Sequence, residues 1–146
     1  MTVSVASMTF DCHDALVVGT FWSAALGRPL DAGASGEFAA IGFAGRRDTA
    51  GWAPLGPGDE PTWLFVKVPE PKTAKNRLHL DLAPDDRTRD EEVERVIALG
   101  AALVADRRNA DGSGWVVLAD PEGNEFCVER SDAEREAGDV VGAVVL

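Results

Sequence analysis

Residues 78–82 read Leu78-His79-Leu80-Asp81-Leu82, and this strictly alternating stretch of apolar and polar residues decides the fold. Successive side chains of a β-strand point to opposite faces, so the three leucines share one face and His79 and Asp81 share the other. The stretch therefore predicts a strand with one buried and one polar face. A second such strand is predicted at residues 125–129, whose alternate positions hold Glu125, Cys127 and Glu129.

The residues after the alternating strand predict one helix and three strands. Thr88 or Asp90 can cap the helix start, and Gly100 stands where a helix would end. Strands are predicted at residues 101–105, 115–119 and 125–129, and the turn Asp120-Pro121-Glu122-Gly123-Asn124 joins the last two as antiparallel neighbours.

The first half of the chain repeats this order. A strand at residues 3–10 is followed by a helix at 15–26, with Asp11 or Asp14 able to cap its start and Gly27 after its end. Further strands are predicted at residues 37–43 and 62–68, separated by a surface loop rich in Gly and Pro. One unit of a strand, a helix and further strands is thus present twice.

Composition limits the classes of partner. The 146 residues are 45% hydrophobic, which suits one domain, and the net charge of −11 opposes binding to nucleic acid or anionic membranes. Residues 1–10 lack the charged and apolar regions of a signal peptide, and no apolar run reaches the roughly 18 residues of a membrane span. Cys12 and Cys127 predict free thiols, and we expect a cytoplasmic protein.

Together these features resemble the vicinal oxygen chelate superfamily, which includes glyoxalase I, bleomycin-resistance proteins and extradiol dioxygenases. The resemblance is carried by the helix end at residues 21–27, the run 68–82 and the turn and strand 120–128, which look most like glyoxalase-like domain proteins of actinobacterial type. It implies an α+β fold in which two βαβββ modules pair into a curled, open U-shaped mixed sheet with ligands on its concave face. We expect one domain over residues 1–130, with modules at about 3–68 and 77–129, and a C-terminal tail at 131–146 that is a short docking strand or a disordered end.

The resemblance also implies where a metal would bind. Metal-using members place one ligand on the first and one on the last strand of each module, which corresponds here to Ser7, residues 65–67, His79 and Cys127. His79 alone has the ligand type of the family, so the usual set is incomplete and the cofactor stays open. His79, Asp81 and Glu125 could form an altered divalent metal site. Alternatively, His79 and Asp81 form a hydrogen-bonded buried pair that shapes a pocket, with Glu125 at its rim.

Aromatic and basic residues supply further candidates. Trp52, in the long loop, could cover an aromatic ligand, whereas Trp22 could instead pack in the core. The basic residues Lys72, Lys75 and Arg77 could meet an acidic or phosphorylated ligand, or could pair with Glu70 and Asp85. The candidate ligand-binding residues are Trp22, Trp52, Trp63, Asn76, Arg77, Trp115 and Cys127.

Two functions follow as the main hypotheses. The first is an enzyme of the glyoxalase type that acts on a small oxygenated metabolite as a lyase, isomerase or dioxygenase, with His79 as metal ligand or general base and Asp81 or Glu125 as proton carrier. The second is a non-catalytic binder of the bleomycin-resistance type that sequesters a hydrophobic or aromatic compound. A structural or interaction module is the third. The expected partner is a small molecule, and a homodimer is a further expectation because relatives often dimerise.

Overall fold

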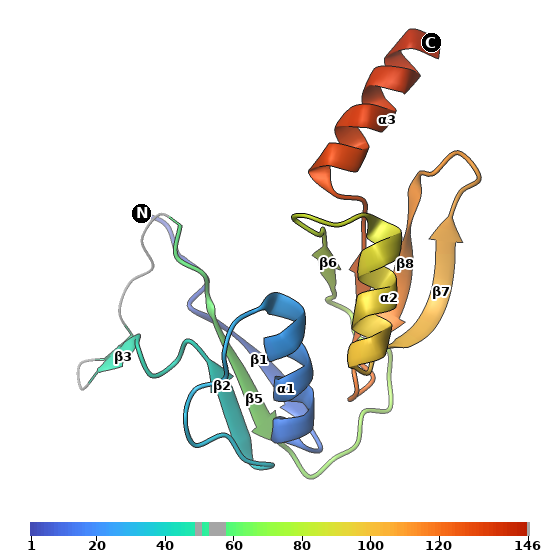
Figure 1. The fold of residues 1–146 in the computed structure, drawn as a ribbon. Helices are drawn as coiled ribbons and strands as arrows, with labels where there is room; N and C mark the ends of the chain where they lie inside the picture. The colour runs from blue at the N-terminus through green and yellow to red at the C-terminus, as the bar shows by residue number, and fades with distance from the viewer. Residues whose placement is uncertain (49–50, 53–57, 146) are drawn as a thin grey trace. The chain divides into compact units, whose positions relative to one another are not determined.

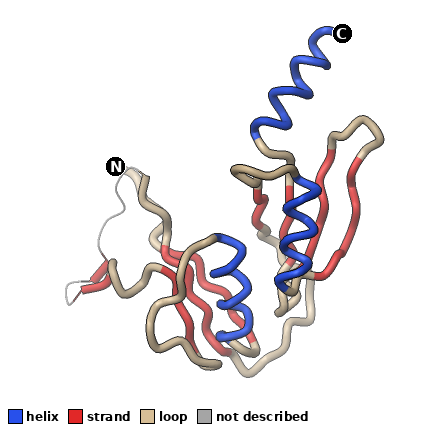
Figure 2. The backbone as a smooth tube through the Cα atoms, in the orientation of Figure 1, coloured by secondary structure: helices blue, strands red, loops and turns tan. Residues whose placement is uncertain are grey.

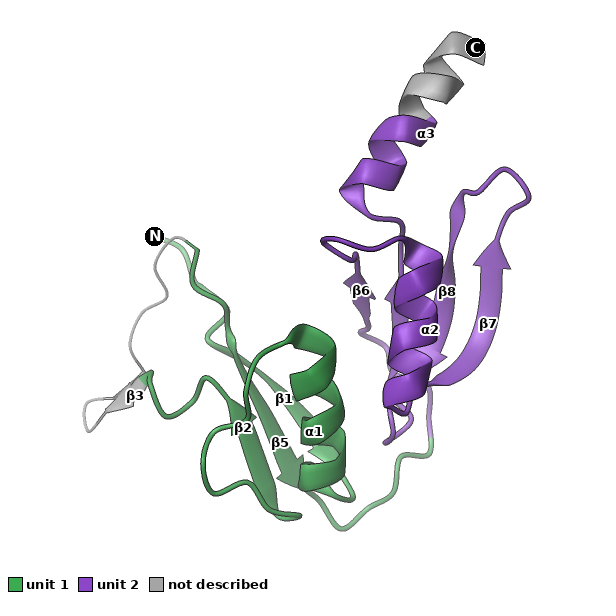
Figure 3. Cartoon of the chain, in the orientation of Figure 1, with its two compact units in different colours: residues 1–73 green, residues 74–146 purple. Residues whose placement is uncertain are grey.

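A computed structural model describes residues 1–48, 51–52 and 58–145, and for residues 47–48, 51–52 and 139–145 it describes the backbone alone. The chain divides into two compact units, residues 1–73 and 74–146 (Figure 3). Each unit combines helix and mixed β-sheet, which confirms the predicted α+β class (Figure 1). None of the described helices has the length and apolar character needed to cross a membrane.

Unit 1 is a three-stranded sheet with one helix packed on it. The sheet order is β1-β5-β2, with β1 parallel and β2 antiparallel to β5, and a small β3-β4 pair is inserted before β5. The elements are β1 (Ser7–Cys12), α1 (Ala15–Leu26), β2 (Phe38–Ile41), β3 (Arg47–Asp48), β4 (Gly51–Trp52) and β5 (Thr62–Lys67).

Helix α1 begins and ends where the sequence predicts. The Asp14 carboxylate accepts hydrogen bonds from the backbone N–H groups of Leu16 and Val17 at 3.0 and 3.2 Å, which satisfies donors that have no partner inside the helix. At the other end Gly27 has φ 67°, the left-handed conformation that glycine adopts without strain.

The core of unit 1 is aromatic. The rings of Phe10 and Trp63 stack with centroids 5.4 Å apart, and Trp22 from α1 lies 5.3 Å from Trp63 and 5.8 Å from Phe10. Trp22 and Trp63 are both buried, as is Phe65. Because β1 alternates, Phe10 faces the helix, and the exposed residues Thr9 and Asp11 lie on the other face of the sheet.

Unit 2 has the complete βαβββ order (Figure 2). Its sheet runs β6-β9-β8-β7, with β6 parallel to β9 and the remaining pairs antiparallel. Its core is mainly aliphatic and includes Val96 of the helix and Leu118 and Phe126 of the sheet. The elements are β6 (Leu80–Leu82), α2 (Arg89–Leu99), β7 (Ala102–Arg108), β8 (Gly114–Ala119), β9 (Glu125–Val128) and α3 (Asp132–Val145).

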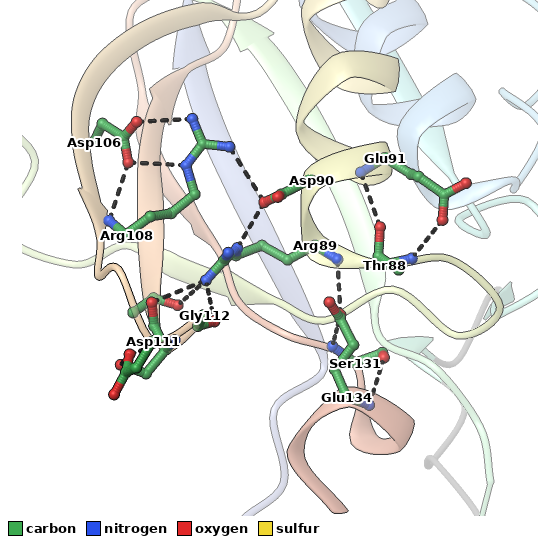
Figure 4. Close-up of polar contacts among 12 residues, drawn as sticks. Thr88, Arg89, Asp90, Glu91, Asp106, Arg108, Asp111, Gly112, Ser131 and Glu134 are labelled. Carbon is green, nitrogen blue, oxygen red and sulfur yellow. Dashed lines mark hydrogen bonds and ion pairs between the residues drawn. The ribbon is translucent and has the colours of Figure 1, made fainter. Parts of the chain in front are cut away.

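A polar network fixes the start of α2 (Figure 4). Thr88 and Glu91 form a reciprocal capping box, so of the two predicted caps Thr88 is the one used. Arg89 is buried, and its Nη1 donates to the carbonyl oxygens of Gly112 at 3.0 Å, Ser113 at 3.1 Å and Gly114 at 3.0 Å. The guanidinium thus holds the β7-β8 turn against the helix start.

The tail after residue 130 forms a helix over its described part, where the sequence left a docking strand and a disordered end as alternatives. Ser131 Oγ accepts from the Glu134 backbone N–H at 3.1 Å, and the Glu134 carboxylate accepts from the Ser131 N–H at 2.8 Å. The same carboxylate accepts from the Arg89 N–H at 2.8 Å. The start of α3 is therefore tied to the start of α2.

The parallel strand pair of each unit, β1-β5 in unit 1 and β6-β9 in unit 2, has the same hydrogen-bond register. In unit 1 the Val68 N–H donates to the Cys12 carbonyl at 3.0 Å, and in unit 2 the Glu129 N–H donates to the Leu82 carbonyl at 2.8 Å. Counting back from these bonds, Asp11 opposite Val66 in unit 1 corresponds to Asp81 opposite Cys127 in unit 2. By the same count, Thr9 corresponds to His79.

Candidate functional site

Three side chains of unit 2, from His79, Asp81 and Cys127, converge on one face of its sheet, and we call them the His-Asp-Cys cluster. Asp81 and Cys127 are directly opposite each other in the parallel β6-β9 pair, and His79 immediately precedes β6. One ligand atom from each of the three residues lies within 4.8 Å of the others. The alternation of residues 78–82 predicts that His79 and Asp81 share a face, and the strand pairing adds Cys127 to them.

His79 and Asp81 form a direct pair. His79 Nδ1 lies 3.2 Å from Asp81 Oδ1, with the two side chains 42% and 50% exposed. The two residues are therefore paired, but the pair is exposed and not buried as predicted. Among the residues that the structure describes, Asp81 is the only partner of His79, so Nε2 of the ring is available to a proton or a ligand.

Cys127 differs from its two neighbours in being buried, with 7% of its surface exposed. Burial is the main cause that raises the pKa of its thiol, and the negative charges of Asp81 and Glu129 add to the effect. The Lys75 ammonium opposes these effects. The protonated thiol is accordingly the favoured form in this structure, and Cys12 and Cys127 are both free thiols as predicted.

A hydrogen-bonded chain positions the loop that leads into β6. The Asn76 N–H donates to Glu125 Oε2 at 3.0 Å, and Asn76 Nδ2 donates to Asn124 Oδ1 at 2.9 Å. Asn124 in turn donates from Nδ2 to Asp120 Oδ2 at 3.0 Å. The turn at residues 120–124, predicted as a chain reversal only, thus also anchors the segment that precedes His79.

The tryptophans predicted to contact a ligand have different surroundings. Trp22 and Trp63 are buried in the aromatic core of unit 1. Of the two predicted alternatives for Trp22, ligand contact and core packing, the structure shows core packing. Trp115, on β8, is 46% exposed. The side chain of Trp52, the predicted lid, lies outside the described residues.

Within the described residues, Lys75 and Arg77 do not make the predicted pairs with Glu70 and Asp85. Lys75 Nζ donates to the Asn76 carbonyl at 3.3 Å. Arg77 is exposed and has no hydrogen bond or ion pair with any residue in the described part of the chain. Its guanidinium is therefore available to a ligand.

Comparison with known proteins extends these findings. A family model described as a glyoxalase-like domain matches residues 7–129. No curated protein matched the chain. A glyoxalase/bleomycin resistance protein/dioxygenase family enzyme from Burkholderia phytofirmans has a similar structure, with a TM-score of 0.58 and 20% identity, covering 86% of this chain and 97% of that one.

Two further solved structures are similar over most of their length. A variant of the fosfomycin resistance protein from Listeria monocytogenes, in complex with manganese(II) and a dihydroxypropylphosphonic acid, has a TM-score of 0.60 and 15% identity, covering 92% of this chain and 94% of that one. A lactoylglutathione lyase from Agrobacterium tumefaciens has a TM-score of 0.52 and 18% identity, covering 88% and 93%. At these identities the structures show a shared fold.

Proposed function

Because the chain belongs to the glyoxalase-like domain family, we propose that it is an enzyme that acts on a small oxygenated metabolite as a lyase or isomerase. The observation that carries the proposal is the His-Asp-Cys cluster, in which an imidazole, a carboxylate and a thiol have atoms within 4.8 Å of one another on one sheet face. Two of the three side chains are exposed, so a substrate can reach them. Proton transfer and metal binding both need such convergent groups.

The donor set of the cluster suits a divalent metal. Nitrogen, oxygen and sulfur donors together favour ions such as zinc or iron over magnesium or calcium, which prefer oxygen alone. His79, Asp81 and Cys127 would hold the ion, and Cys127 must lose its proton to do so. When bound, the ion would polarise the neighbouring oxygens of the metabolite.

The protein's own residues supply orientation and a proton carrier. Glu125 precedes Cys127 by two residues on β9, so the two side chains share the polar face of the strand. The Asn76 N–H fixes the Glu125 carboxylate at 3.0 Å, which limits the positions that the carboxylate can adopt. Glu125 is therefore the residue that takes a proton from the metabolite and returns it at a second position.

A second candidate mechanism uses His79 itself as the base. The 3.2 Å pair with Asp81 places a carboxylate on Nδ1, which orients the ring and favours the tautomer in which Nε2 accepts a proton. This mechanism needs no metal and acts on the same class of metabolite. A non-catalytic binder would need exposed indole faces instead, and of the described tryptophan side chains Trp115 is the exposed one.

Cobalt(II) titration of the tag-free chain tests the proposal. A thiolate-to-cobalt charge-transfer absorption is expected, and His79→Ala should weaken binding by at least about tenfold because it removes a ligand. Cys127→Ser should abolish the charge-transfer absorption even where binding persists. His13→Ala is the matched control, since His13 is the other of the two histidines and should leave the spectrum unchanged.

The outcomes separate the candidates. A chain that takes up no cobalt, zinc or iron after supplementation contradicts the metal mechanism. The isomerisation of α-hydroxy ketones, offered as probe substrates, should then still depend on His79 if His79 is the base. Absence of both metal uptake and turnover would favour the non-catalytic binder.

A further inference from the structure

We infer that the metabolite is an anion, and that Arg77, assisted by Lys75, binds its carboxylate or phosphate group beside the His-Asp-Cys cluster. This inference deepens the proposed function and rests on it, because it places the anionic group next to the proposed reaction centre. Three features of the segment before His79 support it: Arg77 has no ion-pair partner among the described residues, the neighbouring backbone is anchored, and guanidinium and ammonium groups bind anions.

Arg77 is an uncommitted cation in an acidic protein. The net charge is −11, yet the exposed guanidinium of Arg77 has no carboxylate partner within the described ranges. Nearby carboxylates already have partners: Asp81 pairs with His79, Glu125 accepts from Asn76, and Glu129 pairs with Arg135. By contrast, other arginines in the described part of the chain do form ion pairs, namely Arg28, Arg87, Arg89, Arg95, Arg108 and Arg135.

The backbone beside Arg77 is anchored rather than free. Asn76, the preceding residue, is held at its N–H by Glu125 and at its side chain by Asn124, at 3.0 and 2.9 Å. Arg77 is two residues from His79, so their Cα atoms are no more than about 7 Å apart. An arginine side chain easily covers that distance, so its guanidinium can contact a metabolite that also reaches His79.

Lys75 adds a second positive charge at the same site. Its ammonium donates to the Asn76 carbonyl at 3.3 Å, within the same anchored segment that precedes Arg77 and His79. The two cations have complementary chemistry. A guanidinium offers a planar fork of donors that matches the oxygens of a carboxylate or phosphate, whereas an ammonium acts as a compact point charge.

The test compares charged and neutral probes of one shape. Lactate and lactamide differ by charge at nearly constant size, and phosphoglycolate offers a phosphate, so isothermal titration of all three separates charge from shape. The wild-type chain should bind lactate or phosphoglycolate about fivefold more tightly than lactamide, a modest preference because the contact is exposed. The tighter of the two anions identifies the group as carboxylate or phosphate.

Two variants assign the preference to a residue. Arg77→Gln should abolish it, and Arg77→Lys should retain part of it. Arg107→Gln is the matched control, because Arg107 in β7 is also exposed and has no partner among the described residues. Equal binding of lactate, phosphoglycolate and lactamide by the wild type would overturn the inference. Retention of the preference in Arg77→Gln, or an equal loss in Arg107→Gln, would overturn it as well.

Cobalt binding keeps this test separate from the test of the proposed function. Arg77→Gln should leave the cobalt(II) spectrum of the protein unchanged, because Arg77 is not one of the ligands. If the anion preference depends on Arg77 but His79→Ala binds cobalt like the wild type, the anion site is supported and the proposed centre is contradicted. If His79→Ala weakens cobalt binding but Arg77→Gln leaves the anion preference unchanged, the centre is supported and the anion site is contradicted.

Discussion

Unit 1 and unit 2 share the register of their parallel strand pair, β1-β5 and β6-β9, but have different side chains on its polar face. Where unit 2 has His79, Asp81, Glu125 and Cys127, the shared register puts Thr9, Asp11, Leu64 and Val66 in unit 1. The aspartate is common to both units, whereas unit 1 has no counterpart of the imidazole, the glutamate or the thiol at the corresponding positions. The backbone therefore supplies the positions, and the three side chains that differ decide whether those positions carry chemistry.

The opposite faces of the two sheets differ as well. Unit 1 packs Phe10, Trp22 and Trp63 against one another, whereas unit 2 is held by an aliphatic core and by the charged network around Arg89. Large rings bury more apolar surface for each residue than valines do. The stability of unit 1 should therefore depend on a few residues, and that of unit 2 on many small contributions.

The largest expected effect is the gain of a whole site in unit 1. If register alone places the donors, Thr9→His together with Val66→Cys should build a second cluster around the native Asp11, because these positions correspond to His79 and Cys127. Cobalt(II) titration should then show a second bound equivalent and a stronger thiolate-to-cobalt absorption than in the wild type.

The single variants are the controls for this transplant. Thr9→His alone offers only nitrogen and oxygen donors, so it should not strengthen the thiolate absorption. A double variant that folds, as judged by circular dichroism, and still binds only the wild-type amount of cobalt would contradict the claim that the register alone places the donors. Features of unit 2 beyond the register, such as the Asn76 anchor, would then be required.

The second effect concerns the aromatic core. Trp22→Ala should lower the free energy of unfolding by about 4 kcal/mol, because it removes a buried indole and leaves a cavity. Val96→Ala, in the core of unit 2, should cost about 2 kcal/mol. Urea denaturation followed by circular dichroism measures both. Val17→Ala on the exposed face of α1 is the control, and a loss as large as that of Trp22→Ala would contradict the assignment of Trp22 to the core.

Local signals in the sequence were enough to predict most of this architecture. The bounds of α1 follow from Asp14, Gly27 and the spacing of apolar residues, and the strand at residues 78–82 follows from its alternation. The tail helix was not predicted, because Gly138 and the valine-rich end have low helix propensity. Its start is fixed both by the local cap of Ser131 and Glu134, which the sequence pattern at residues 131–134 could have indicated, and by the distant contact between Glu134 and Arg89.

The candidate site, too, could be predicted only in part from local sequence patterns. Alternation within each strand predicts that His79 and Asp81 share a face, as do Glu125 and Cys127. Which residue of one strand meets which of the other is decided by the parallel register, and that register depends on pairing between residues more than forty positions apart in the chain. The burial of Arg89 is likewise not predictable from the local sequence, because it depends on hydrogen bonds to the distant carbonyl groups of Gly112 and Gly114.

The smallest expected effect is the acid sensitivity of the charged network in unit 2. Hydrogen bonds from the Arg108 side chain and backbone lower the pKa of Asp106 from 3.8 to about 2, and hydrogen bonding to Arg89 likewise lowers the pKa of Asp90. A pKa that folding lowers contributes stability above the unfolded value, and this contribution disappears as the pH falls toward the folded value. The stability difference between wild type and Asp106→Asn should therefore be constant above about pH 5, decrease as the pH falls below about 4, and disappear below about pH 2. Thermal unfolding at a series of pH values measures it, and because Asp106 is exposed the difference should be small and should decrease with added salt. A difference that persisted undiminished well below pH 2, where the carboxyl group is protonated in the folded state as well, would show that the carboxylate charge is not what stabilises this part of unit 2.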